Sequence, residues 1–334
     1  MTILFEALKK AKTVAIISHV GPDGDTLGSM MGLYSGLLQL KHLEKIDCFV
    51  NGSVPEIFKF LPHIKDVKTP YYKNIEDKYD IAIAVDCAAI DRLDDSLGIF
   101  NKAKFSVNID HHGTNDGFGN LSIIKPKASS VGEILTDLLP ELGIEINQEI
   151  AQSLYVSILT DTGCFKFENT TTNTFLACSK LIELGISAQE IYKKCYEHKP
   201  LNMIKLQAYA ITNATFENEK IAYSIISRDV LNQFGGKDSY TDGISEALRS
   251  ASSIEISMLL KEMQNGDTKV SMRSKNINVS EIAAFFGGGG HRLAAGCIIQ
   301  KKPEDALLEI LPIARKQLEK YEKEKLSTSN KGIF

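Results

Sequence analysis

The chain has 334 residues, of which 43% are hydrophobic and 24% are charged, a composition typical of a globular protein that is long enough for two domains. Its formal net charge of −4 argues against a protein that binds duplex DNA, which would carry a basic surface. The six cysteines include no C-x-x-C pair, so they predict neither a disulfide framework nor a structural zinc site. Because no signal peptide and no membrane-spanning apolar run is evident, we expect a cytoplasmic protein without a membrane partner.

Short apolar runs alternate with helical patterns in the first half of the chain. These runs predict strands at 13–18, 45–50, 80–86 and 104–110, and a helix is predicted at 27–40. The runs are continuously apolar, as is typical of strands that are buried on both faces. The pattern predicts an α/β fold with a mostly parallel sheet flanked by helices, in which ligands bind beyond the carboxyl ends of the strands.

The rest of the chain predicts helices and then a second domain. Two helical patterns between 130 and 192 end at Gly143 and Gly185. We expect a first domain over 1–190, a connector over 191–212, a second and smaller α/β domain over 213–325, and a flexible tail over 326–334.

The first group of polar residues lies in the segment SHVGPDGDTLGS, where a predicted strand gives way to a helix. It contains His19, Asp23 and Asp25 around a turn formed by Pro22 and Gly24. One imidazole and two carboxylates form a ligand set for a divalent cation. The alternative is that the aspartates only form turns and cap the helix, and the segment alone supports both interpretations equally.

Further acids and imidazoles follow other apolar runs: Asp86, then Asp110, His111 and His112, and then Asp161. Taken singly, Asp86 could cap a loop, and for Asp161 a helix N-cap is the more ordinary interpretation. Taken together, they fall where a parallel sheet would gather them at one edge. Oxygen ligands with imidazole and no thiolate favour Mn²⁺ or Mg²⁺, and two such ions are suited to phosphate-ester hydrolysis.

A glycine-rich segment in the second half has features of an anion-binding site. The glycines at 287–290 are followed by His291 and Arg292, and Arg273 lies in the preceding strand-like segment. Glycine lets backbone N–H groups approach an anion closely, although a run of glycines is often only a flexible turn. The chain has no P-loop, no GxGxxG, no GxSxG and no HExxH motif.

Six motifs in order, HVGPDGDTLGS, VDCAAIDR, IDHHGT, LTDTGCF, SMRSK and GGGGHRLAAG, resemble those of the DHH phosphoesterase superfamily. The last two are similar to its associated DHHA1 domain. A chain with these two domains and no others most resembles the nanoRNase group, whose members act as oligoribonucleases and pAp phosphatases.

This resemblance implies a role for each site residue. It implies one cation held by His19, Asp23 and Asp86, and a second held by Asp25, Asp86, His111 and Asp161, with Asp86 as the bridge. The catalytic set is Asp86, Asp110, His111 and His112, in which His112 contacts phosphate and Asp110 orients an imidazole. The substrate-binding set is His112, Arg273, Ser274, Gly289, Gly290 and His291. The chain departs from the family pattern at Gly21 and Thr26, and both metals are still expected.

The resemblance implies hydrolysis of short oligoribonucleotides (nanoRNA) to mononucleotides, and of pAp to AMP, with two divalent cations, Mn²⁺ preferred and Mg²⁺ second. A phosphodiesterase of cyclic or linear dinucleotides such as c-di-AMP and pApA is the main alternative. A single-strand exonuclease would need an OB-type domain, a pyrophosphatase would lack GGGGH, and a non-catalytic regulator would not need an intact ligand set. The sequence leaves cleavage polarity and a homodimer open, and the expected partners are short RNA oligomers or small nucleotides.

Overall fold

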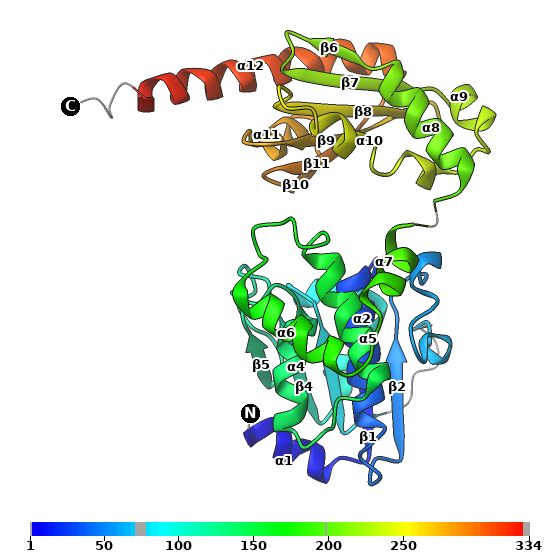
Figure 1. The fold of residues 1–334 in the computed structure, drawn as a ribbon, viewed down its shortest axis with the longest axis vertical. Helices are drawn as coiled ribbons and strands as arrows, with labels where there is room; N and C mark the ends of the chain where they lie inside the picture. Colours follow the sequence, from blue (N-terminus) through cyan, green and yellow to red (C-terminus); the bar gives the residue numbers. More distant parts are fainter. Residues whose placement is uncertain (1, 71–77, 198, 330–334) are drawn as a thin grey trace. The chain divides into compact units, whose positions relative to one another are not determined.

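The chain folds into two compact units, Met1–His198 and Lys199–Phe334 (Figure 1). The computed structural model describes residues 2–70, 78–197 and 199–329, with side chains as far as 325. Two helices occupy the segment that we predicted as a connector: α7 (Ala188–Tyr196) belongs to the first unit, and α8 (Leu201–Thr212) to the second. Of the predicted tail, the last helix continues to Ser329, and residues 330–334 lie outside the described residues.

The first unit contains a five-stranded sheet in the order β2-β1-β3-β4-β5, and every pairing in it is parallel. Its strands are β1 (Thr13–Ile17), β2 (Lys45–Phe49), β3 (Ile81–Val85), β4 (Phe105–Asp110) and β5 (Leu121–Ile124). The four predicted strands are confirmed. The sequence missed β5 because this edge strand is short and only partly buried, and therefore carries no continuous apolar run.

Helices cover both faces of this sheet, as the apolar strands predicted (Figure 1). They are α1 (Thr2–Lys10), α2 (Gly24–Leu37), α3 (Leu97–Lys102), α4 (Val131–Glu141), α5 (Gln148–Asp161) and α6 (Thr172–Glu183), with α7. Side chains alternate along β1: Val14 and Ile16 pack in the core with α2, α4 and α5, whereas Ala15 and Ile17 pack with the segment around α3. Every residue of β1 after Thr13 is therefore buried.

Glycines bring α2 unusually close to α5. A Cβ added at Gly28 would lie 2.5 Å from the carbonyl oxygen of Ser153, and one added at Gly32 would lie 2.6 Å from a methyl carbon of Leu154. Side chains at these positions would therefore force the two helices apart. The close packing matters for function because the first turn of α2 then lies beside the last turn of α5, where a Cβ at Gly24 would collide with Thr160.

The second unit contains a six-stranded mixed sheet in the order β10-β11-β9-β8-β7-β6, in which only β7 and β8 pair in parallel. Its strands are β6 (Thr215–Glu217), β7 (Ile221–Ile226), β8 (Ile256–Glu262), β9 (Thr268–Ser274), β10 (Gly289–His291) and β11 (Ala294–Ile299). Its further helices are α9 (Arg228–Gln233), α10 (Ile244–Arg249), α11 (Val279–Ala284) and α12 (Pro303–Ser329). The α/β fold class that we predicted for both domains is confirmed.

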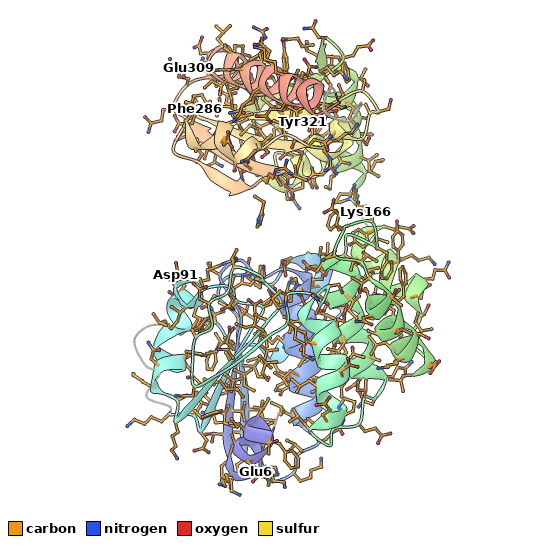
Figure 2. The ribbon with its side chains drawn as sticks, turned by 90° about the vertical axis from the view of Figure 1, so that its left-hand side faces the viewer. Glu6, Asp91, Lys166, Phe286, Glu309 and Tyr321 are labelled. Carbon is orange, nitrogen blue, oxygen red and sulfur yellow. The ribbon has the colours of Figure 1, made fainter. Side chains whose placement is uncertain are left out.

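Two separate apolar clusters stabilise the second unit. One lies between the sheet and α11 and α12, and Phe286 and Tyr321, both labelled in Figure 2, pack against it. The other lies on the opposite side and contains Leu206 of α8 and Leu248 of α10. Each unit thus has its own core, as expected for a domain. Within the described part of the chain, no helix has both the length and the apolar character required to cross a bilayer.

Candidate metal centre

The ends of three parallel strands bring together the ionisable residues that the sequence singled out. His19 follows β1, Asp86 directly follows β3, and Asp110 is the last residue of β4. All three residues are at most 4% exposed. Because these strands are neighbours with parallel directions, their carboxyl ends meet at one edge, as the sequence predicted.

Asp161 reaches the same place by another route. We expected it at the edge of the sheet after an apolar run, with a helix N-cap as the ordinary alternative. The N-cap alternative is wrong, because Asp161 is the last residue of α5, and its carboxylate lies with Asp25 and His111, although it comes from a helix and not from a strand. The apolar run before it is a buried helix, and a short apolar run by itself does not distinguish a helix from a strand.

The first candidate ligand group comprises His19, Asp23 and Asp86, whose ligand atoms all lie within 4.8 Å of one another. Nε2 of His19 lies 3.5 Å from Oδ2 of Asp86. Asp23 is also the N-cap of α2, since its side chain accepts a hydrogen bond from the backbone N–H of Thr26. Helix capping and membership of the ligand group, which we had treated as alternatives for Asp23, therefore hold together.

The second group comprises Asp25, His111 and Asp161. Nε2 of His111 lies 3.5 Å from Oδ2 of Asp25 and 3.5 Å from Oδ2 of Asp161. Asp25 does not cap the helix. It extends from the first turn of α2 to accept hydrogen bonds from the backbone N–H of Val131, at 3.0 Å, and from the hydroxyl of Ser157, at 2.5 Å. These bonds fix the carboxylate of Asp25 against α4 and α5.

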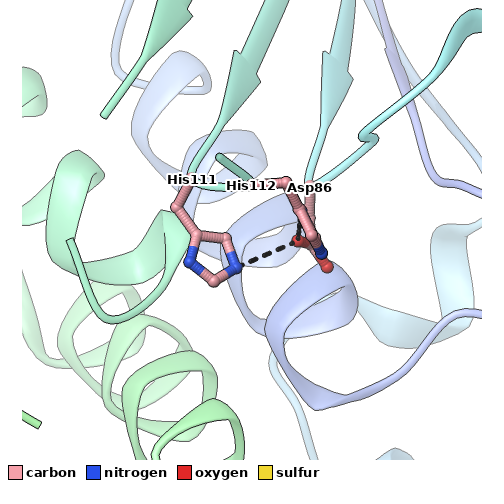
Figure 3. Close-up of side chains that lie close together, drawn as sticks. All are labelled: Asp86, His111 and His112. Carbon is pink, nitrogen blue, oxygen red and sulfur yellow. Dashed lines mark ion pairs between the residues drawn. The ribbon is translucent and has the colours of Figure 1, made fainter. Parts of the chain in front are cut away.

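Asp86 faces both groups with different oxygens. Its Oδ2 faces His19, whereas its Oδ1 lies 3.7 Å from Nε2 of His111 and 3.7 Å from Nδ1 of His112 (Figure 3). Oδ1 is buried and has no hydrogen-bond partner among the described residues. Asp86 also has a left-handed backbone, with φ of 56°. An orphaned buried carboxylate oxygen and a strained backbone are both costly, and such features concentrate at functional sites.

Both ligand histidines place Nδ1 beside a backbone carbonyl group, and for His111 this contact fixes which nitrogen carries the proton. Nδ1 of His19 lies 2.8 Å from the carbonyl oxygen of Val20, and Nδ1 of His111 lies 3.2 Å from that of Ala128. A carbonyl can only accept, so Nδ1 of His111 is the donor and its Nε2 directs a lone pair toward the carboxylates, whereas Nδ1 of His19 also faces Nη2 of Arg92, which can only donate. Metal-binding histidines are commonly oriented in this way.

Among the residues that contact these side chains, Arg92 and Asn115 were not assigned from the sequence. Nη2 of Arg92 lies 3.1 Å from Nδ1 of His19, and Nδ2 of Asn115 donates to Oδ2 of Asp110 at 2.6 Å. Both lie within or just beyond the segments that drew attention, VDCAAIDR and IDHHGT. The available signal in the sequence was a polar residue shortly after an acid that ends a strand. Where the side chain of such a residue points depends on the conformation of the loop.

His112 has a different environment from the two ligand histidines. Its Nδ1 donates to Oδ1 of Asp110 at 2.8 Å, so this nitrogen is not available as a metal ligand. The hydrogen bond to Asp110 raises the pKa of His112 above its usual value, although burial opposes the increase. The side chain is 34% exposed, so its other nitrogen is accessible to a substrate.

The second group is electrostatically unfavourable as it stands. Burial, followed by the negative charges of Asp86 and Asp161, raises the pKa of Asp25 well above its usual value. Burial also raises the pKa of Asp161 to about 6, with Asp86 adding to the increase and His111 opposing it. Buried like charges of this kind are normally compensated by a cation. The donor set and the orphaned oxygen of Asp86 therefore fit divalent cations.

The predicted substrate-binding residues lie in the second unit. Pairing of β9, β11 and β10 places Arg273, Ala294 and His291 in one row across the sheet. Side chains in one row point to the same face, and alanine between the two larger residues leaves that row open. Nε of Arg273 donates to Oε1 of Glu246 at 2.7 Å.

The other members of this predicted set differ in exposure. Ser274 is fully buried, and its hydroxyl donates to the carbonyl oxygen of Ile277. Gly289, Gly290 and His291 are all exposed in β10. At Gly290, φ is 142° and a Cβ would lie 2.5 Å from the carbonyl oxygen of Ala294, so only glycine fits there. The binding roles of these residues stay predictions.

Comparisons with known proteins agree with this architecture. The DHH family N-terminal domain matches residues 13–158, and the DHHA1 domain matches residues 218–320. The bifunctional oligoribonuclease and PAP phosphatase NrnA of Thermus thermophilus is 30% identical over 95% of this chain and 94% of its own length. The protein of the same name from Bacillus subtilis is 30% identical over 89% of this chain and 93% of its own length. The crystal structure of an exopolyphosphatase-related protein from Bacteroides fragilis, 26% identical, superposes with a TM-score of 0.85 and covers 96% of this chain and 95% of its own. The chain therefore belongs to the DHH family, with a DHH N-terminal domain followed by a DHHA1 domain.

Proposed function

We propose that this DHH-family phosphoesterase uses two divalent cations to hydrolyse short oligoribonucleotides to mononucleotides, and that it also converts pAp to AMP. The observation that carries the two-cation part is the orientation of Asp86. Its Oδ2 faces the first ligand group, and its buried, unpaired Oδ1 faces the second. A single carboxylate placed in this way suits a bridge between two ions.

The residues that would hold the ions follow from the two groups. His19, Asp23 and Asp86 would hold one, and Asp25, His111 and Asp161 would hold the other with Asp86. When bound, two such ions supply an activated water and neutralise charge on the phosphate oxygens. Nitrogen and carboxylate oxygen donors together support Mn²⁺ as the preferred ion, with Mg²⁺ as a weaker substitute.

The contribution of His112 is separate from metal binding. Asp110 accepts from Nδ1 of His112 and holds the ring in place, and Asn115 in turn holds Asp110. Nε2 of His112 is then able to contact a phosphate oxygen, and a protonated ring would stabilise the negative charge that develops there. In the second unit, we propose that Arg273 and His291 bind the nucleotide part of the substrate.

The choice of substrate rests on relatives. Those from Thermus thermophilus and Bacillus subtilis are named as oligoribonucleases and PAP phosphatases, and they match this chain over nearly its whole length.

All six cysteines are free thiols, which supports a reducing compartment such as the cytoplasm.

A substrate panel under one Mn²⁺ concentration tests the proposal. The panel contains RNA oligomers of two to five nucleotides, a longer RNA, pAp, pApA and c-di-AMP. We expect the short oligomers and pAp to be hydrolysed fastest, and we expect Asp86→Asn to abolish both activities. Asp137→Asn, which removes an exposed carboxylate paired with Lys180, is the matched control and retains them. Faster turnover of c-di-AMP, or of pApA alone among the linear oligomers, would replace the proposed substrate, and turnover in excess chelator would refute the two-cation mechanism.

A further inference from the structure

The hydroxyl of Thr26 lies among the three side chains of the first ligand group. Its Oγ1 is 2.6 Å from Nε2 of His19, 2.7 Å from Oδ2 of Asp86 and 3.1 Å from Oδ1 of Asp23. Thr26 is fully buried in the first turn of α2. It therefore contacts one ligand atom from every member of the group, which the sequence did not indicate.

A hydroxyl and a cation make conflicting demands on this space. Mg²⁺ requires oxygen ligands at about 2.0–2.1 Å and tolerates little departure from octahedral geometry. The Thr26 oxygen is already at hydrogen-bonding distance from the same three atoms. It has one proton, so it can donate to only one of the two carboxylates or to the imidazole at any moment. A cation that approaches these ligand atoms therefore finds them already hydrogen-bonded to the Thr26 hydroxyl.

The position of Thr26 is well constrained. Its backbone N–H is bonded to the side chain of Asp23 at 3.0 Å, so the helix cap fixes the main chain. A threonine side chain in a helix has two favoured χ1 rotamers, because in one of them its hydroxyl can bond a carbonyl one turn earlier. The hydroxyl can therefore leave the first ligand group by a change of rotamer, which breaks its present hydrogen bonds.

In the part of the chain that the structure describes, no donor in the second ligand group bonds to more than one of its side chains: the backbone N–H of Val131 donates to Asp25, and the amide of Asn169 donates to Oδ2 of Asp161. Among the described residues, the only hydroxyl bonded to one of its carboxylates is that of Ser157, which donates to Oδ1 of Asp25. It makes no hydrogen bond to His111 or Asp161. The two groups thus differ in how freely a cation can take its ligands.

We propose that the Thr26 hydroxyl competes with the cation at the first position, so that the two positions bind cations with unequal affinity and the first is the weaker. This inference rests on the proposed two-cation function and adds a regulation to it. At limiting metal concentration the second position fills first, and occupancy of the first position follows the available Mn²⁺.

Calorimetric titration of the full, metal-stripped chain with Mn²⁺ tests the inference without an activity measurement. We expect two Mn²⁺ per wild-type chain, with distinct dissociation constants. Thr26→Ala removes the hydroxyl, and we expect it to tighten the weaker site by about 10-fold, the lower end for hydrogen bonds to charged groups. Thr26→Ser retains the hydroxyl and is expected to stay within about threefold of wild type. Weaker binding in Thr26→Ala would show that the hydroxyl is itself a ligand, and unchanged binding would also overturn the proposal.

Two controls connect the effect to this position. Thr136→Ala removes another buried helical threonine, whose hydroxyl donates to the carbonyl oxygen of Gly132, and should leave both affinities unchanged. In a His19→Ala background the first position lacks its imidazole, so the tighter site dominates the titration, and Thr26→Ala should leave the affinity of that site unchanged. A gain at the tighter site would overturn the inference. Failure of the proposed function would give a different result: the wild-type chain would bind Mn²⁺ as expected but would not hydrolyse the substrates.

Discussion

Replacement of Asp86 by asparagine should have opposite effects on catalysis and on the stability of the metal-free protein. Asparagine has nearly the same volume and tolerates the left-handed backbone found at this position, where φ is 56°. Its carbonyl oxygen can still accept the hydrogen bond that Thr26 donates to Asp86. The substitution therefore removes the charge of the bridge with little structural disturbance.

The size of each effect can be worked from the site. Asp86 serves both ligand groups, so its loss leaves each group with one fewer anionic ligand, and we expect kcat to fall by more than about 100-fold, or about 2.7 kcal/mol. In the metal-free protein the sign reverses. The rise in the pKa of Asp161 from 3.8 to about 6 corresponds to about 3 kcal/mol between its protonation states. Burial and His111 affect the pKa of Asp161 more than Asp86 does, so Asp86 accounts for only part of this energy. We therefore expect the free energy of unfolding of metal-free Asp86→Asn to exceed that of the wild type by about 1 kcal/mol.

Thermal unfolding with and without Mn²⁺, together with kcat, measures both effects. Mn²⁺ should stabilise the wild type by about 2.7 kcal/mol for each site at a concentration of 100 times the Kd of that site, and Asp86→Asn by much less. Asp137→Asn again serves as the control for loss of one carboxylate. A variant that retains more than a tenth of the wild-type kcat, or that gains the same stability from Mn²⁺ as the wild type, would refute the bridging role.

Three further outcomes are expected. EDTA should abolish hydrolysis, and Mn²⁺ should restore it more fully than Mg²⁺, as a metal-readdition series will measure. Arg273→Ala and His291→Ala should each lower kcat/KM for a dinucleotide by about 10- to 150-fold. The same variants should lower kcat/KM for bis-p-nitrophenyl phosphate by less than about threefold. Equal losses on both substrates would place these residues in the catalytic centre. Asp80, whose pKa is lowered to about 2 chiefly by Lys104 and by the backbone N–H of Lys12, should stabilise the fold above its ordinary pKa near 3.8, and this stability is lost as pH falls toward 2. Urea unfolding of Asp80→Asn should therefore show a loss of about 1 kcal/mol at pH 7, reduced by solvent screening, that disappears near pH 2.

Much of the metal centre was predictable because it depends on local sequence and on one rule of topology. Continuous apolar runs identified four of the five strands, and parallel strands end at a common edge. The placement of His19, Asp86 and Asp110 follows from these two facts, whatever the details of the packing. Asp161 did not follow from them, because its apolar run is a helix, and the choice between helix and strand depended on contacts distant in the sequence.

By itself, the sequence determined which chemical groups are available and at which edge of the first sheet most of them gather, because residue type and strand direction are local properties. Only the tertiary structure decided how these side chains are divided between the two ligand groups. The approach of α2 to α5 through Gly28 and Gly32 places Asp25 and Asp161 in one group, and no local pattern encodes that distance. The tertiary structure also orients the two oxygens of Asp86 toward different groups and places the Thr26 hydroxyl within the first one. Such contacts depend on the relative positions of elements that are far apart in the chain, and a single sequence specifies these positions only through the complete core.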